Sequence, residues 1–213
     1  MDASTYEQAD IIHDLNVPVP DNLKAQFDVV FDGGTMEHVF NYPQAIKNAM
    51  EMVKIGGRLM LYFPANNWCG HGFYQFSPEL MYRMLSENNG YKMEHVYAHG
   101  KGDRWYSVVD PEVVQERVEL NRERCTTYLL VQARRTTEKP IFHDLPQQSD
   151  YVAKWQIDAT YRQRAIGQWI DAHFPEFVGM WLRHGMARLR NSWNHRGTLR
   201  YGKHFTPVKL LTK

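Results

Sequence analysis

The alternation of apolar and polar positions predicts three consecutive elements in the first third of the chain. Residues 27–31 (FDVVF) are almost all apolar, which is typical of a central parallel strand covered on both faces. In the next segment, NYPQAIKNAMEMVK, apolar residues recur at helical spacing, with Asn41 in position to cap the helix and Pro43 in its first turn. A glycine pair ends this helix, and residues 58–63 (RLMLYF) predict the next strand.

The same spacing rules predict further elements on both sides of this region. The segment SPELMYRMLSENNGY begins with Ser77 as a helix cap and ends at Gly90. Short strands are expected at residues 10–13, 93–98 and 126–133, and a short helix inside 113–120. The order strand–helix–strand–helix–strand is typical of α/β proteins, so we expect helices packed on a mostly parallel sheet of about five strands.

A change in composition divides the chain near residue 139. Residues 139–150 (KPIFHDLPQQSD) are polar and proline-bearing, which is typical of a linker. Beyond them, apolar residues at helical spacing predict two helices, and residues 150–213 carry 11 Lys and Arg against 4 Asp and Glu. We therefore expect an α/β domain over 1–138, a linker over 139–150 and a basic, aromatic-rich helical tail over 151–213.

Overall composition narrows the class of protein. The chain of 213 residues is 43% apolar and 23% charged, as in ordinary globular proteins. Its apolar runs are too short to cross a bilayer. Cys69 and Cys125 are too few for a disulfide framework, so we expect reduced thiols and a cytoplasmic protein.

Four short motifs follow one another between residues 27 and 66, from the predicted strand at 27–31 to just beyond the one at 58–63. They are Phe27-Asp28, Met36-Glu37-His38, Lys54-Ile55-Gly56-Gly57 and Pro64-Ala65-Asn66. In this order and spacing they resemble the second half of the class I S-adenosylmethionine-dependent methyltransferase fold. The resemblance extends over residues 1–136 and implies an incomplete Rossmann-like sheet taken from the strand order 3-2-1-4-5-7-6.

The resemblance also implies which residues would hold the cofactor, S-adenosylmethionine. In this family an acidic residue at the end of strand 2 holds the ribose hydroxyls, and another at the end of strand 3 lies beside the adenine. Asp2 and Asp14, the latter followed by Leu15, match those two places. A carboxylate suits the ribose because it can accept two hydrogen bonds from a vicinal diol.

The residues that follow the predicted strand at 27–31 are candidates for both cofactor and acceptor binding. Asp32, Gly33 and Gly34 would line the methionine end of the cofactor, or they would form only a tight turn. Glu37 would contribute to the cofactor crevice at the carboxyl edge of the sheet, and His38 would orient the acceptor or act as a general base. The alternative for this pair is a helix start whose side chains hydrogen-bond to the backbone.

The loop NNWCGHGFYQFSP at residues 66–78 is rich in aromatic side chains. Trp68, Tyr74 and Phe76 are candidates for stacking on a sugar ring or another planar acceptor. His71 is the candidate in this loop for accepting the acceptor's hydroxyl proton. Alternatively, the aromatic residues only cover the end of the sheet.

No metal site is expected from the sequence. His95 and His99 are four residues apart on a predicted strand, which separates them by about 13 Å. Cys69 and His71 are close in sequence, but no second pair of ligands accompanies them.

The basic tail matches no known nucleic-acid-binding motif, so no nucleic-acid partner is expected. Two alternatives stay open for it: a plain amphipathic helix pair, or contact of its basic residues with an anionic membrane.

In the methyltransferase family a glycine-rich loop approaches the cofactor, and it would precede Asp2, where the sequence has only Met1. We therefore expect the sheet to lack its first strand and that loop, which leaves the apolar strand at 27–31 on an open edge. Such an edge favours a homodimer or larger self-assembly, with binding of S-adenosylmethionine weakened or lost.

Two functions stay open at this point. The first is methyl transfer from S-adenosylmethionine to an oxygen or nitrogen of a small acceptor, such as a sugar or a polysaccharide precursor. The second is a truncated, non-catalytic methyltransferase fragment or partner subunit that self-associates through its open sheet edge.

Overall fold

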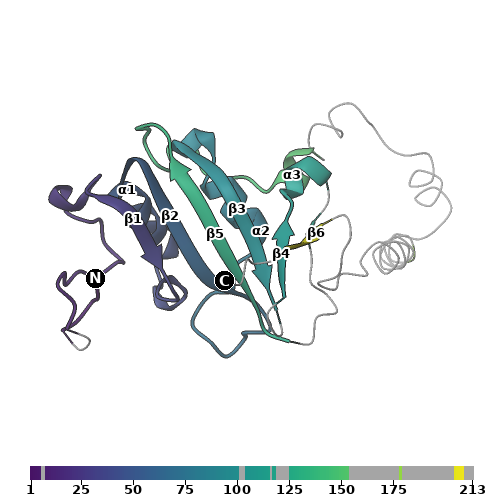
Figure 1. The fold of residues 1–213 in the computed structure, drawn as a ribbon, viewed down its shortest axis with the longest axis horizontal. Helices are drawn as coiled ribbons and strands as arrows, with labels where there is room; N and C mark the ends of the chain where they lie inside the picture. Colours follow the sequence, from purple (N-terminus) through teal and green to yellow (C-terminus); the bar gives the residue numbers. More distant parts are fainter. Residues whose placement is uncertain are drawn as a thin grey trace.

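The computed structural model describes residues 1–5, 8–100, 104–115, 117–118, 125–153, 178 and 204–208. In this part of the chain, six strands form one open sheet with the order β1-β2-β5-β3-β4-β6 (Figure 1). The strands are β1 (Phe27–Asp32), β2 (Val53–Asn66), β3 (Tyr91–His99), β4 (Trp105–Val108), β5 (Thr127–Arg135) and β6 (Phe205–Val208). The helices are α1 (Tyr42–Met52), α2 (Pro78–Met84) and α3 (Pro111–Val114), with 3-10 turns η1 (Asp21–Leu23), η2 (Met36–His38) and η3 (Glu87–Asn89).

The architecture is mixed α/β, as expected, but the prediction of a mostly parallel sheet is wrong. Among the strand pairs of the described residues, β1 and β2 are parallel, and the other four pairs are antiparallel. The reason is that β5 inserts between β2 and β3 in the opposite direction, while β4 and β6 add antiparallel neighbours beyond β3. β3 therefore still runs in the same direction as β1 and β2, although it touches neither of them.

The helix predicted after β1 is present, but its two ends differ from expectation. Asn41 does not cap α1; its side-chain amide instead donates a hydrogen bond to the Asn16 carbonyl (3.1 Å). α1 ends at Met52 rather than at the glycine pair, and β2 begins at Val53 because that residue already pairs with β1. Gly56, with a φ of +86°, lies inside β2 where the register with β1 is irregular.

Other predicted elements are confirmed in part. The Ser77 side chain accepts a hydrogen bond from the Leu80 N–H (3.2 Å) and starts α2 as predicted, but η3 rather than α2 reaches Gly90. The predicted strand at 10–13 is reduced to one parallel bridge between Asp2 and Ile12. β4 was not predicted at all.

The C-terminal tail contributes an element that its helical pattern did not predict. Residues 205–208 form β6, which pairs with β4 at the edge of the sheet opposite β1. The two tail helices predicted from the sequence lie outside the described residues. Residues 139–150 of the predicted linker pack on the domain, where the Ser149 N–H donates to the Glu79 carboxylate (2.7 Å).

The core lies between one face of the sheet and the helices α1 and α2 (Figure 1). Alternate residues of β2 point into it, and each is fully buried: Leu59, Leu61 and Phe63. This alternation is the period of two that the RLMLYF segment predicts. Among the described residues, no helix is long and apolar enough to span a bilayer.

The edge strand β1 departs from the fully covered strand that its apolar sequence predicts. Val29 is 52% exposed and Phe31 is 62% exposed. β1 is the terminal strand of the sheet and pairs only with β2 among the described strands. An apolar strand has therefore been left with one open edge and one poorly covered face.

Candidate functional site

Asp32, the last residue of β1, holds the turn that leads into η2. Its carboxylate accepts hydrogen bonds from the backbone N–H groups of Thr35 (3.0 Å) and Met36 (3.2 Å). Gly34 lies in the same turn with a φ of +119°, a conformation that is strained for residues with a side chain. A buried carboxylate and a glycine therefore fix the direction in which η2 leaves the sheet. This is the tight-turn alternative for Asp32.

Glu37 joins η2 to the loop that follows β2. Its backbone carbonyl accepts hydrogen bonds from the N–H groups of Phe73 (2.7 Å) and Tyr74 (3.3 Å). Gly72, just before them, has a φ of +69°, and a Cβ at that position would lie 2.7 Å from the Glu37 carbonyl oxygen. Because residue 72 has no side chain, the loop comes close enough to bring His71 against Glu37.

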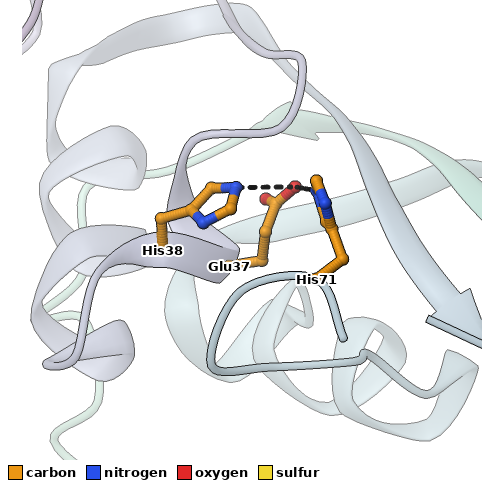
Figure 2. Close-up of side chains that lie close together, drawn as sticks. All are labelled: Glu37, His38 and His71. Carbon is orange, nitrogen blue, oxygen red and sulfur yellow. Dashed lines mark ion pairs between the residues drawn. The ribbon is translucent and has the colours of Figure 1, made fainter. Parts of the chain in front are cut away.

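The side chains of Glu37, His38 and His71 converge here, and we call them the Glu-His-His cluster (Figure 2). Glu37 is 1% exposed, whereas both imidazoles are about half exposed. Its Oε1 lies 3.4 Å from Nε2 of His71 and 4.0 Å from Nε2 of His38. The two imidazole rings meet at 73° with their centroids 4.9 Å apart. Among the described residues, Oε2 of Glu37 is buried without a hydrogen-bond partner.

Two aromatic side chains, Trp68 and Tyr128, pack beside the cluster. The Trp68 ring lies 5.1 Å from the His71 ring and 4.8 Å from the Tyr128 ring. Burial raises the pKa of Tyr128, and the neighbouring charge of Glu37 raises it further. Like an ordinary tyrosine, Tyr128 keeps its hydroxyl protonated at neutral pH, so it can act there as a hydrogen-bond donor.

A second aromatic pair joins Phe73, one of the aromatic residues of the 66–78 loop, to Phe40, which was not predicted as a site residue. Phe40 and Phe73 are both exposed and contact each other edge to face, with ring centroids 5.8 Å apart. Phe40 follows His38 by two residues, and Phe73 follows His71 by two residues. The signal that could have found this pair is that matched spacing from the two histidines. The pair offers an apolar surface for a ligand next to the cluster.

The predicted aromatic residues of the loop take three different positions. Trp68 lies beside the cluster, next to the His71 ring. Tyr74 is half buried, and its hydroxyl donates a hydrogen bond to the Phe40 carbonyl (2.6 Å). Phe76 is buried against Tyr42, with ring centroids 4.6 Å apart, so it covers the end of the sheet and cannot stack on an acceptor.

The two predicted nucleoside-binding carboxylates each close a local turn. Asp2 accepts hydrogen bonds from the N–H (2.7 Å) and the hydroxyl (3.0 Å) of Ser4. Asp14 accepts from the N–H (2.9 Å) and the side-chain amide (2.7 Å) of Asn16, and these two bonds, the backbone bond first, lower the pKa of Asp14. Asn16 in turn accepts a hydrogen bond from the Asn41 N–H (2.9 Å), which ties this turn to the segment after η2.

A groove of about 220 Å³ lies between the N-terminal segment and β1. Its walls are mostly apolar and include the exposed side chains of Val29 and Phe31. Leu15 and Asp32 are the predicted cofactor residues that line it. The other predicted cofactor residues do not line it: Asp2, Asp14, Gly33, Gly34 and Glu37.

Two separate places in the described structure that could bind a ligand include residues predicted for the site. The groove beside β1 is mostly apolar and offers few polar groups to a ligand. Its one carboxylate, Asp32, already accepts backbone hydrogen bonds in the turn before η2. The Glu-His-His cluster combines one buried carboxylate with two exposed imidazoles, whose ligand atoms all lie within 4.8 Å of one another. Three such groups can hydrogen-bond a polar ligand, exchange a proton with it or bind a metal ion.

Comparison with known proteins leaves the family open. No protein-family model matches the sequence, and no curated protein matches it. One similar solved structure comes from work on the conversion of a disulfide bond into a thioacetal group during echinomycin biosynthesis. It is 10% identical with a TM-score of 0.38, and the match covers 72% of this chain and 62% of that one. The chain therefore spans less than two thirds of that neighbour's length, and a likeness this distant does not assign a fold family.

Proposed function

We propose that this chain is a methyltransferase-like protein of the S-adenosylmethionine-dependent class I type. The strand order carries the proposal. If β1, β2, β3 and β5 are counted as strands 4, 5, 6 and 7, their observed order reads 4-5-7-6. That is the second half of the order that the four sequence motifs imply, including the insertion of the last strand between two earlier ones.

The N-terminal segment supports the same proposal. The residues expected at the ends of strands 2 and 3 are paired in parallel through the bridge between Asp2 and Ile12, with the His13 N–H donating to the Asp2 carbonyl (2.8 Å). The groove lies between this pair and β1, where the resemblance calls for one more strand. The cofactor would bind at this carboxyl end of the sheet, where open α/β sheets take their ligands.

The proposed reaction needs little from the protein beyond alignment of the two substrates. An acceptor oxygen or nitrogen forms a bond to the methyl carbon, the carbon–sulfur bond breaks with its electron pair left on sulfur, and the acceptor loses its proton to solvent water. Holding the two reactants in line supplies most of the rate enhancement over the uncatalysed reaction. Glu37, His38 and the loop over 66–76 would shape the acceptor site, with the exposed Phe40 and Phe73 suited to a sugar ring.

Isothermal titration of the full chain with S-adenosylhomocysteine tests this proposal. Saturable heat is expected. The family resemblance assigns Asp14 to the nucleoside, and Asp14 adjoins Leu15, which lines the groove, so Asp14→Asn should weaken binding by roughly tenfold. Asp21→Asn is the matched control, since its carboxylate is exposed and, within the part of the chain that the structure describes, forms its ion pair with Lys24. Absence of heat at millimolar ligand would refute cofactor binding by this chain alone.

A second candidate function, self-association through the edge of β1, is favoured by a specific observation. The groove of about 220 Å³ is smaller than the roughly 300–1,000 Å³ of small-molecule sites, and it is lined by the exposed Val29 and Phe31 of an edge strand. Edge strands of this kind pair readily with another chain. We propose that the partner is a second copy of this chain.

Light scattering after size-exclusion chromatography tests the second candidate. The wild-type chain is expected to elute as a dimer or larger assembly, and Phe31→Lys is expected to elute as a monomer because an inserted charge blocks edge pairing. Leu145→Lys is the control, since Leu145 is also an exposed apolar residue (73%) but lies in the 139–150 segment, outside β1. A wild-type chain that stays monomeric at high concentration would refute self-association through the edge of β1.

A further inference from the structure

We propose that the Glu-His-His cluster is a binding site for one divalent transition-metal ion, with Glu37, His38 and His71 as its ligands. One carboxylate and two neutral imidazoles are a common protein ligand set for zinc, iron(II) and manganese(II). The inference stands on the geometry of the three side chains and does not depend on methyl transfer. It departs from the expectation of no metal, which weighed only His95 with His99 and Cys69 with His71.

The distances within the cluster fit a single ion. Zinc–nitrogen and zinc–oxygen bonds of about 2.0–2.2 Å place two ligands of one ion roughly 3–4 Å apart. Oε1 of Glu37 lies 3.4 Å from one histidine Nε2 and 4.0 Å from the other, and all three ligand atoms lie within 4.8 Å of one another. Figure 2 shows both imidazoles turned toward the same carboxylate. Only a shift of less than about 1 Å is needed for all three to reach one ion.

The buried carboxylate gives independent support. Glu37 is 1% exposed, and its Oε2 is buried with no hydrogen-bond partner among the described residues. A buried carboxylate oxygen without a partner is costly, because it has lost its water and gained nothing in exchange. A cation bound beside Oε1, which faces both histidines, would compensate the buried negative charge of this carboxylate. Buried charges in proteins are usually paired or coordinate metals.

The surrounding backbone holds the ligands in place as metal sites require. Asp32 fixes the turn before η2, which carries two of the ligands, and the Glu37 carbonyl accepts two N–H groups from the loop that carries the third. A Cβ at Gly34 would lie 3.1 Å from Oε1 of Glu37, and a Cβ at Gly72 would lie 2.7 Å from the Glu37 carbonyl oxygen. Both glycines therefore leave space that the carboxylate and the loop occupy. Supporting groups of this kind orient metal ligands.

The arrangement is that of an open metal site rather than a closed structural one. Three protein ligands leave at least one coordination position for water or a substrate atom, and both histidines face solvent. An oxygen or nitrogen of a small molecule would take that position, beside the exposed Phe40 and Phe73. A metal-bound histidine nitrogen cannot accept a proton, so this assignment replaces a general-base role for His38 and His71.

Equilibrium titration of the untagged, chelator-treated full chain with zinc and, separately, with manganese tests the proposal. One zinc ion per chain is expected, with zinc bound more tightly than manganese because zinc lies later in the general affinity order of divalent metals. His71→Ala, His38→Ala and Glu37→Gln should each weaken zinc binding at least about tenfold, since even the loss of a supporting group costs 10–100-fold. His143→Ala is the control, because His143 is exposed and lies outside the cluster.

Circular dichroism and a urea melt of each variant separate loss of the site from loss of the fold. The two histidine variants remove half-exposed side chains and are expected to fold, so they carry the test even if Glu37→Gln unfolds. Zinc bound equally well by both folded histidine variants, or not bound by the wild-type chain, would overturn the assignment. The titration contains neither cofactor nor acceptor, so failure of the proposed methyl transfer would leave its result unchanged.

Discussion

Gly72 provides the sharpest test of how the loop after β2 is held against η2. It has a φ of +69°, and a Cβ there would lie 2.7 Å from the Glu37 carbonyl oxygen and 3.1 Å from the Glu37 Cγ. In proteins, Cβ atoms essentially never come within 3.0 Å of a heavy atom outside their own residue and its two chain neighbours. Gly56 is a natural control, since its φ is +86° but a Cβ there would meet nothing within 4 Å.

The two substitutions to alanine differ by one physical cause, the close contact. Both place a side chain in the left-handed region, which costs about 1–2 kcal/mol. Gly72→Ala must also push Glu37 away, and overpacking of this kind costs about 1–3 kcal/mol more. We therefore expect Gly56→Ala to lose about 1–2 kcal/mol of unfolding free energy and Gly72→Ala about 2–5 kcal/mol.

Urea denaturation at equilibrium, followed by circular dichroism, measures the two unfolding free energies. Zinc titration of the same two variants gives a second readout, because displacing Glu37 separates it from His71. Gly56→Ala should bind zinc as the wild-type chain does, and Gly72→Ala should bind it more weakly. Equal losses of stability in the two variants would show that the loop does not press on Glu37, and the description of the cluster would fail with it.

Three further predictions concern the rest of the domain. Phe63→Ala should destabilise the fold by about 3–5 kcal/mol in a urea melt, because the ring is fully buried between the sheet and the helices. Tyr91→Phe should cost about 1–3 kcal/mol in the same assay, since it leaves the Met50 carbonyl without its buried hydroxyl donor (2.6 Å). Hydrogen bonding, first from Gln132, lowers the pKa of Glu94 from 4.5 to about 2. A lowered folded-state pKa means that the stabilisation is present above pH 4.5 and is lost as the pH falls toward 2, and Glu94→Gln should remove that part of the pH dependence in acid titration melts.

The positions of the main strands could be predicted from the sequence, but their directions could not. The alternation in RLMLYF marks the buried residues of β2 correctly, because one face of that strand packs on the helices and the other does not. The family resemblance implies the place of β5 between β2 and β3, but nothing in the sequence of residues 127–135 gives its direction. An apolar strand reads the same whether its neighbour is parallel or antiparallel, so the antiparallel pairing of β5 with both neighbours was not foreseen.

Element ends were less predictable because long-range contacts decide them. A glycine pair is a good stop signal for a helix, yet the pairing of Val53 with Phe27 ends α1 earlier and draws the glycines into β2. Asn41 has the right side chain for a cap, but the carbonyl of Asn16, 25 residues away, takes its amide instead. β6 pairs with β4 across about 100 residues of chain, a distance over which local patterns carry no information.

The candidate site shows the same division between local and long-range information. The pairing of Glu37 with His38 can be read from the sequence because the two residues are neighbours, and both were predicted as site residues. His71 was also predicted, but as a proton acceptor in a separate loop. What the sequence could not supply is the pair of backbone hydrogen bonds from that loop to the Glu37 carbonyl. Those two bonds, with Gly72 between the segments, turn a predicted acid–histidine pair and a predicted single histidine into one cluster of three possible metal ligands.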